Sequence, residues 1–222
     1  QAAPLMMSTT TSPRDRSLAV AAMVTALLAV TAAATPAAAA EWHVAPGGSD
    51  LDPGTPEAPF ATIQHAIAAA DTGDIVLLAD GVHEGEGNRQ ISFLGKAIKV
   101  RSAGGVREKC VVRLDGHDGF LFQSGESQAS LLADLTIRGG SRGVDVSSGF
   151  PSLANCVIDS CTIGLDVSGM GTRVSVAGFL ITRCGTGVLF RDAAGGGTLA
   201  DTQRSEERRV GKECRSRWPP YH

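Results

Sequence analysis

The stretch Leu132-Ala133-Asp134-Leu135-Thr136-Ile137 recurs twice further along the chain, as Leu153-Ala154-Asn155-Cys156-Val157-Ile158 and as Val176-Ala177-Gly178-Phe179-Leu180-Ile181. Each copy places a small residue, a larger apolar residue and an isoleucine at alternate positions. Eleven residues after its start each copy reaches a glycine: Gly143, Gly164 and Gly187. A second alternation of apolar residues follows each glycine. These glycines are 21 and 23 residues apart. Such a period, with two strands per repeat, predicts a solenoid in which each coil buries its apolar residues against the next.

The alternation has a period of two, which indicates strands rather than helices. No repeat contains a helix-period stretch long enough to compete. A leucine-rich repeat would need its Leu and Asn pattern with a helix or extended return in each unit, and neither is present. The sequence therefore predicts an all-β parallel β-helix, in which residues one period apart stack about 4.8 Å from each other.

The N-terminal segment has the pattern of a secretory signal peptide. Arg14 and Arg16 precede an apolar, alanine-rich stretch over residues 18–34, and small residues lead to Glu41. We expect residues 1–40 to comprise upstream residues and this signal peptide. The product would then be secreted, periplasmic or on the cell surface, with no membrane span after cleavage. A retained membrane anchor is the alternative, although the run is short and rich in alanine for a permanent span.

The last segment, residues 204–222, breaks the glycine rhythm. It begins Arg-Ser-Glu-Glu-Arg-Arg and is similar to the translation of a sequencing adapter. A basic surface tail and a nucleic-acid-binding patch are the alternatives. On the adapter interpretation the β-helix coils, expected over residues 75–203, are truncated.

Between these two segments the chain is acidic. Residues 41–203 carry 12 basic and 19 acidic residues, a formal net charge of −7. This balance argues against a general affinity for nucleic acid or anionic lipid. The length suffices for one domain.

Residues 41–74 predict an N-terminal strand followed by a short capping helix. Phe60, Ile63, Ile67 and Ala70 fall on one helical face, and Gly73 follows the expected end of the helix. Such a helix can cover strand edges and apolar side chains at the open end of the first coil.

This region resembles the N-terminal part of the secreted right-handed parallel β-helix proteins of the pectin-lyase-like superfold. The resemblance rests on Trp42-His43-Val44-Ala45-Pro46-Gly47-Gly48-Ser49-Asp50, on Pro53-Gly54-Thr55 and on Pro59-Phe60-Ala61-Thr62-Ile63-Gln64-His65-Ala66-Ile67. It implies a right-handed β-helix. For activity it implies only a choice among polysaccharide lyases, other carbohydrate enzymes and uncharacterised surface proteins, because this opening occurs on all of them.

Stacking assigns the repeat positions to two faces. The predicted inward columns are Ala133/Ala154/Ala177, Leu135/Cys156/Phe179, Ile137/Ile158/Ile181 and Val146/Val167/Phe190. Outward columns are where ligand contacts would lie. One of them stacks Asp145 on Asp166 and Leu189.

Two like charges one strand spacing apart repel unless something positive lies between them. The resemblance implies that this positive charge is a Ca²⁺ ion, since acidic β-helix lyases use Ca²⁺ held by carboxylates to bind acidic sugars. Asp145 and Asp166 are therefore the candidate calcium ligands. Solvated surface aspartates are the alternative.

Three residues are candidates for catalysis. His117 could exchange protons near neutral pH, although Gly116-His117-Asp118 departs from the Gly-His-Gly of polygalacturonases, and a polar turn residue is the simpler interpretation. Lys99 and Arg101 alternate outward on a predicted strand, and the resemblance implies that bases of this type serve lyases of the superfold. Both residues are equally consistent with solvent-facing strand positions.

Cys161 and Cys184 each lie three residues before a repeat glycine, so they occupy equivalent places on adjacent coils. Their Cα separation should approach strand spacing, which is within disulfide range, and export would allow oxidation. A reduced column of small buried thiols is the alternative.

Two function classes remain. The first is an exported protein that associates with or acts on polysaccharide, as a lyase-like enzyme on acidic glycans. The second is a non-catalytic surface or glycan-binding β-helix module. The sequence contains no complete catalytic set for either hydrolysis or elimination.

Overall fold

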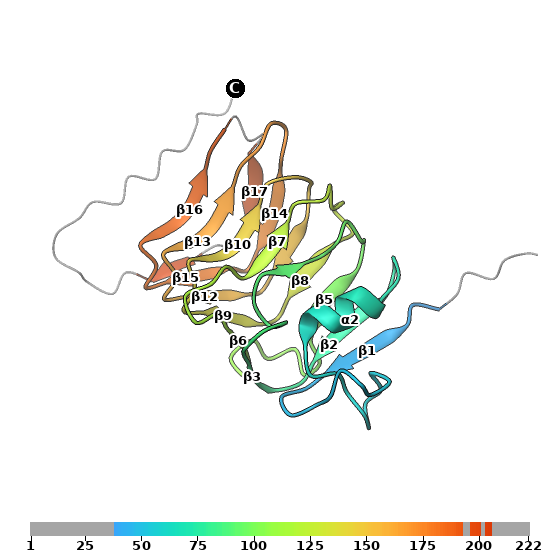
Figure 1. The fold of residues 1–222 in the computed structure, drawn as a ribbon. Coiled ribbons are helices and arrows are strands. Elements are labelled where there is room, and N and C mark those ends of the chain that lie inside the picture. Colours follow the sequence, from blue (N-terminus) through green and yellow to red (C-terminus); the bar gives the residue numbers. More distant parts are fainter. Residues whose placement is uncertain (1–37, 193–195, 201–202, 206–222) are drawn as a thin grey trace, which may run out of the picture. The chain divides into compact units, whose positions relative to one another are not determined.

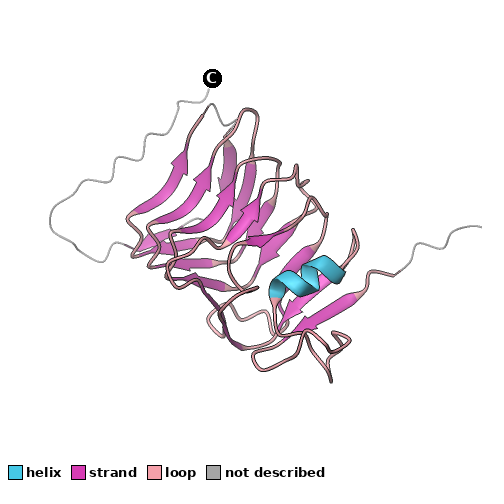
Figure 2. Cartoon of the chain, in the orientation of Figure 1, coloured by secondary structure: helices cyan, strands magenta, loops and turns pink. Residues whose placement is uncertain are grey.

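The computed structural model describes residues 38–192, 196–200 and 203–205. This part of the chain is built almost wholly of β-strands, with one short helix (Figures 1 and 2). It contains no helix long and apolar enough to span a membrane. The signal peptide and adapter interpretations lie outside the described residues, apart from residues 38–40 and 204–205.

The strands form three parallel sheets, named here A, B and C. Sheet A has seven strands in the order β1 (Glu41–Val44), β2 (Ile75–Leu78), β5 (Lys99–Ser102), β8 (Leu131–Ala133), β11 (Ser152–Ala154), β14 (Val174–Ala177) and β17 (Gly197–Ala200). Sheet B has six, in the order β3 (Gly81–His83), β6 (Cys110–Arg113), β9 (Thr136–Arg138), β12 (Val157–Asp159), β15 (Leu180–Thr182) and β18 (Gln203–Ser205). Sheet C has five, in the order β4 (Ile91–Ser92), β7 (Phe120–Phe122), β10 (Arg142–Val146), β13 (Ile163–Val167) and β16 (Thr186–Phe190).

From β2 to β16 each coil contributes one strand to every sheet, so the chain winds as a parallel β-helix, and β1, β17 and β18 extend sheets A and B (Figure 1). Residues one repeat apart pair directly: Ile158 lies beside Ile137 on one side and beside Ile181 on the other. All three isoleucines are buried. The predicted fold class and the predicted isoleucine column are confirmed.

One predicted inward column is wrong in two of its three members. Ala133 is buried as predicted, but Ala154 is half-buried and Ala177 is exposed, and the preceding residues Leu132, Leu153 and Val176 are buried in all three coils. The reason is a corner between sheets A and B.

At this corner the residue after each alanine has a left-handed backbone, with φ of 59° at Asp134, 47° at Asn155 and 65° at Gly178. The chain turns there and the alternation restarts, so a period of two does not continue from one sheet into the next. Short polar residues and glycine tolerate this conformation best.

A second column also differs from the prediction at its last member. Val146 and Val167 are fully buried, as expected, but Phe190 is 38% exposed. The core side chain of the last of these three coils is therefore less buried than those of the two coils before it.

The repeat glycines form a column at the corner where the chain enters sheet C. A Cβ added to Gly143 would lie 2.8 Å from the carbonyl oxygen of Gly164, and one added to Gly164 would lie 2.6 Å from that of Gly187. Both are closer than real Cβ contacts, so the coils approach too tightly here for any side chain. This packing explains the regular glycine spacing.

The helix α2 (Ile63–Ala69) covers the first coil. Thr62 caps its start, where the Thr62 hydroxyl accepts a hydrogen bond from the N–H of His65. Ile63, Ala66 and Ile67 are buried beneath it. At the other end the Lys96 ammonium donates to the carbonyls of Ile67, Ala68 and Ala70 at 2.7–2.9 Å, which satisfies groups that a helix C-terminus leaves unpaired. The predicted capping helix is confirmed.

The glycine column can be tested with a matched pair of substitutions. We expect Gly164→Ala to lower the free energy of unfolding by roughly 1–3 kcal/mol, because the new methyl group forces the coils apart. In Gly187→Ala the added Cβ meets only Ile181 Cγ2, at 3.9 Å, so we expect a change below about 0.5 kcal/mol. Urea unfolding measures both. Equal effects of the two substitutions would contradict the close-approach explanation.

Candidate functional site

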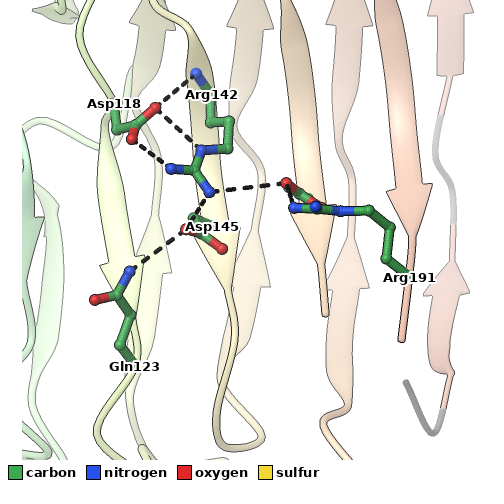
Figure 3. A network of polar contacts seen from close by, with 6 residues as sticks. Asp118, Gln123, Arg142, Asp145 and Arg191 are labelled. Carbon is green, nitrogen blue, oxygen red and sulfur yellow. Dashed lines mark hydrogen bonds and ion pairs between the residues drawn. The ribbon is translucent and has the colours of Figure 1, made fainter. Parts of the chain in front are cut away.

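The candidate site is a network of charged side chains on sheet C (Figure 3). Asp145 of β10 pairs in register with Asp166 of β13. The flanking Val144 and Val146 are buried in the core, so both aspartates project from the opposite face of the sheet. The predicted stacking of Asp145 on Asp166 is confirmed.

Arg142 occupies the centre of this network. Its Nε and Nη2 donate to the two carboxylate oxygens of Asp118 at 3.1 and 2.7 Å, which is a bidentate pair. Its Nη1 donates to Asp145 at 2.7 Å and lies 3.9 Å from Asp166. One guanidinium therefore contacts carboxylates from three consecutive coils, on the stretches that hold β7, β10 and β13.

Arg191 provides the second cation. It follows β16, one coil beyond Asp166, and its Nε donates to Asp166 Oδ1 at 3.0 Å while its Nη2 donates to Asp166 Oδ2. Asp166 is fully buried, whereas the Arg191 side chain is 44% exposed. The two guanidinium groups thus cover the carboxylates and remain in contact with solvent.

The network holds Asp145 in an unusual environment. Burial raises the pKa of Asp145, the neighbouring Arg142 opposes that rise, and the nearby Asp166 adds to it. Gln123 Nε2 donates to Asp145 Oδ2 at 3.4 Å. Asp145 Oδ1 is buried and has no hydrogen-bond partner among the described residues. The pKa of Arg142 is raised, chiefly by its hydrogen bonds to Asp118.

The alternative of solvated surface aspartates is wrong, because Asp145 and Asp166 are 2% and 0% exposed. The predicted need for positive charge between them is met by arginine. This arrangement does not fit calcium well: arginines contact Asp145 Oδ2 and both Asp166 oxygens, which leaves Asp145 Oδ1 as the one carboxylate oxygen of this pair without a partner in the described part of the chain. The described residues also contain no group of three or more His, Cys, Asp or Glu side chains suited to a metal.

Calcium binding at Asp145 and Asp166 stays a prediction of the sequence, and calorimetry tests it. From the arginine contacts we expect Ca²⁺ to give the same baseline heat with the wild type and with Asp166→Asn. A saturable heat in the wild type that disappears in Asp166→Asn would show instead that calcium displaces the guanidinium groups.

The three candidate catalytic residues lie in different places. His117 is exposed in the turn before β7, where its Nδ1 lies 3.2 Å from Arg89 Nη1. It directly precedes Asp118 of the network. Lys99 and Arg101 lie on β5 in sheet A, where Lys99 is exposed and Arg101 is half-buried. The structure therefore brings Asp145 and Asp166 together, leaves the His117 side chain in contact with Arg89, and places Lys99 and Arg101 on another sheet.

The residues that complete the network were not among the predicted site residues. Arg142 and Arg191 come from the start of one strand and from the segment after another, outside the aligned columns. A usable signal was present: Arg142 lies three residues before Asp145, and Arg191 lies two residues after Leu189, which pairs in register with Asp166. A search for arginine near each stacked acid would have found both.

Cys161 and Cys184 are free thiols in this structure. Cys161 is buried and Cys184 is half-buried. Their predicted equivalence on adjacent coils agrees with the register on both sides, because Asp159 pairs with Thr182 and Ile163 pairs with Thr186. The disulfide itself stays a prediction.

Together the fold and this site define a parallel β-helix protein with an arginine–carboxylate network on one outer sheet face. No protein-family model and no curated protein matches the chain. Among solved structures, a rhamnogalacturonan lyase is similar, with a TM-score of 0.46 and 14% sequence identity over 73% of this chain. The match covers 45% of that lyase chain, so this chain spans less than half of its length.

The pairing in the network can be measured by a double-mutant cycle. We expect Arg142→Gln to lower the free energy of unfolding by about 2 kcal/mol at neutral pH, because buried Asp145 loses its cation. This is less than the roughly 3–5 kcal/mol of a fully buried pair, since Arg142 is partly solvated. Adding Asp145→Asn should recover about half of the loss. Strictly additive effects in urea unfolding would show that the two side chains are not coupled.

Proposed function

We propose that this protein is an exported parallel β-helix that associates with acidic polysaccharide along the outer face of sheet C. One observation carries the proposal. Carboxylate and guanidinium groups alternate across consecutive coils of that face, from Asp118 through Arg142 and Asp166 to Arg191. Export follows from the signal-peptide pattern of the sequence.

The arginines supply the chemistry that recognises acidic sugars. Arg191 uses Nε and Nη2 for Asp166, and its Nη1 group makes no hydrogen bond among the described residues. An arginine held by one carboxylate is pre-oriented, so its remaining N–H groups can bind a second carboxylate with little loss of side-chain freedom. A uronate carboxylate is such a partner, and a sugar hydroxyl can bind Asp118 at the other edge of the network, where the carboxylate is partly exposed.

The geometry favours an extended polymer over a compact ligand. The charged residues lie on adjacent strands, and neighbouring parallel strands are about 4.8 Å apart. A chain of sugars that crosses the strands along the axis of the solenoid would therefore meet a charged group at each coil, with a guanidinium on every second coil. Repeated weak contacts of this kind add up along a polymer.

A lyase-like activity on acidic glycans is the second candidate, and one observation favours it. Asp145 is a carboxyl group whose pKa is raised by burial and which lies against a guanidinium group. Such a group is a candidate for proton exchange with a bound sugar, and cations beside it would stabilise negative charge that develops next to a uronate carboxyl.

Binding can be tested with polygalacturonate and with its carboxyl-reduced, neutral form. In calorimetry at about 0.15 M salt we expect the wild type to bind only the acidic polymer. Arg191→Gln should weaken that binding about tenfold, because the variant loses a charge-assisted hydrogen bond to the uronate at a partly solvated position. Arg191→Lys keeps the charge beside Asp166 and should weaken binding by a smaller factor.

The matched control is Arg113→Gln, which removes an exposed arginine paired with Glu84 on sheet B. It should leave the affinity within about twofold. Equal weakening by Arg113→Gln and Arg191→Gln, or absence of binding by the wild type, would contradict the proposal. Ultraviolet absorbance of the same mixtures reports the second candidate: released unsaturated uronates that disappear in Asp145→Asn would identify a lyase, and unchanged absorbance would exclude one on this substrate.

A further inference from the structure

The second chemical feature of the coils is the thiol column at the corner between sheets B and C. Cys161 and Cys184 occupy the same register position on successive coils, and the N–H of Gly185 donates to the carbonyl of Cys161 at 3.1 Å. Register partners on neighbouring parallel strands lie about 4.8 Å apart, which is within the Cα separation of disulfides. This separation is compatible with a disulfide between the two coils.

The two thiols differ in their surroundings. Cys161 is 3% exposed, whereas Cys184 is half-buried. Their hydrogen bonds are equivalent: Cys161 Sγ donates to the carbonyl of Asp159 at 3.6 Å, and Cys184 Sγ donates to that of Thr182, the register partner of Asp159, at 3.4 Å. An incoming reagent can reach Cys184 first, and Cys161 lies behind it.

We propose that Cys161 and Cys184 are an exchange-active thiol pair, in which Cys184 attacks an incoming disulfide and Cys161 then closes a disulfide between two successive coils. This inference is independent of the proposed polysaccharide binding. It assigns a modification site, and it commits to one of the two cysteine states that the sequence left open.

The exchange has two balanced steps, written here with glutathione disulfide as the oxidant. The Cys184 thiolate attacks one sulfur of glutathione disulfide, which forms a mixed disulfide and releases one glutathione thiolate. Cys161 then loses its proton and attacks the Cys184 sulfur, which releases the second glutathione. Two cysteines are oxidised, one glutathione disulfide is reduced to two thiols, and the two protons end on glutathione.

Electrostatics supports the same order of events. The interaction with Cys161 lowers the pKa of the Cys184 thiol, whereas the interaction with Cys184 and burial raise the pKa of Cys161. The more exposed sulfur is therefore the one that carries the thiolate, which is the attacking species. The remaining described cysteines, Cys110 and Cys156, are fully buried, and burial raises the pKa of each to about 12.

The experiment uses the full chain with Cys214→Ser, so that only the four cysteines of the described coils remain. After incubation in glutathione disulfide, intact mass and peptide mapping should show a Cys161–Cys184 link and free Cys110 and Cys156. The oxidised protein should melt roughly 5 °C or more above the reduced protein.

Single variants test the order of attack. Cys161→Ala should accumulate a glutathione adduct on Cys184, because no resolving thiol is present, whereas Cys184→Ala should leave Cys161 at least about tenfold slower to react. Should either variant fail to fold, iodoacetamide labelling of the reduced, otherwise unsubstituted protein gives the same information, with Cys184 labelled first. Equal labelling of all four cysteines, or a link that involves Cys110 or Cys156, would overturn the proposal.

Discussion

Every part of this structure depends on one constraint, that each coil lies directly over the previous one with the same residue positions in contact. The constraint favours columns of one side-chain type, because like shapes pack without gaps. Ile137, Ile158 and Ile181 meet it by filling the core. Gly143 and Gly164 meet it by having no side chain where the backbones are too close for one.

The same constraint creates a problem for charged residues, since an acid that recurs in register lies beside its own copy. Asp145 and Asp166 are in that position, and both are buried. Arg142 and Arg191 resolve the repulsion from neighbouring positions, and each keeps part of its guanidinium in solvent. The chemistry of sheet C is therefore a consequence of coil stacking, because the cations that stabilise the acids are also the groups able to meet an anionic ligand.

The sequence was sufficient to predict the structural features that recur in every coil, and insufficient to predict the corners and the contacts made by single residues. The isoleucine column, the glycine column and the capping helix follow from periodicity, which stacking translates directly into contacts. The alanine column was misplaced because the left-handed backbone at Asp134 and Asn155 interrupts the alternation at a corner, and no residue pattern along one strand reports that. Arg142 and Arg191 were not predicted because their contacts join different coils from positions outside the aligned columns.

Lys96 has a consequence for how this architecture can change its length. Its ammonium donates to three carbonyls at the end of α2, which link the helix to the coil that it covers. Separating the helix from this coil would expose the ammonium, the carbonyls and the apolar side chains beneath the helix. A coil inserted between α2 and Lys96 would break these contacts, whereas a coil inserted further along the solenoid would leave them intact. The contacts between Lys96 and α2 therefore constrain the number of coils at the helix-covered end of the described solenoid and leave it unconstrained elsewhere.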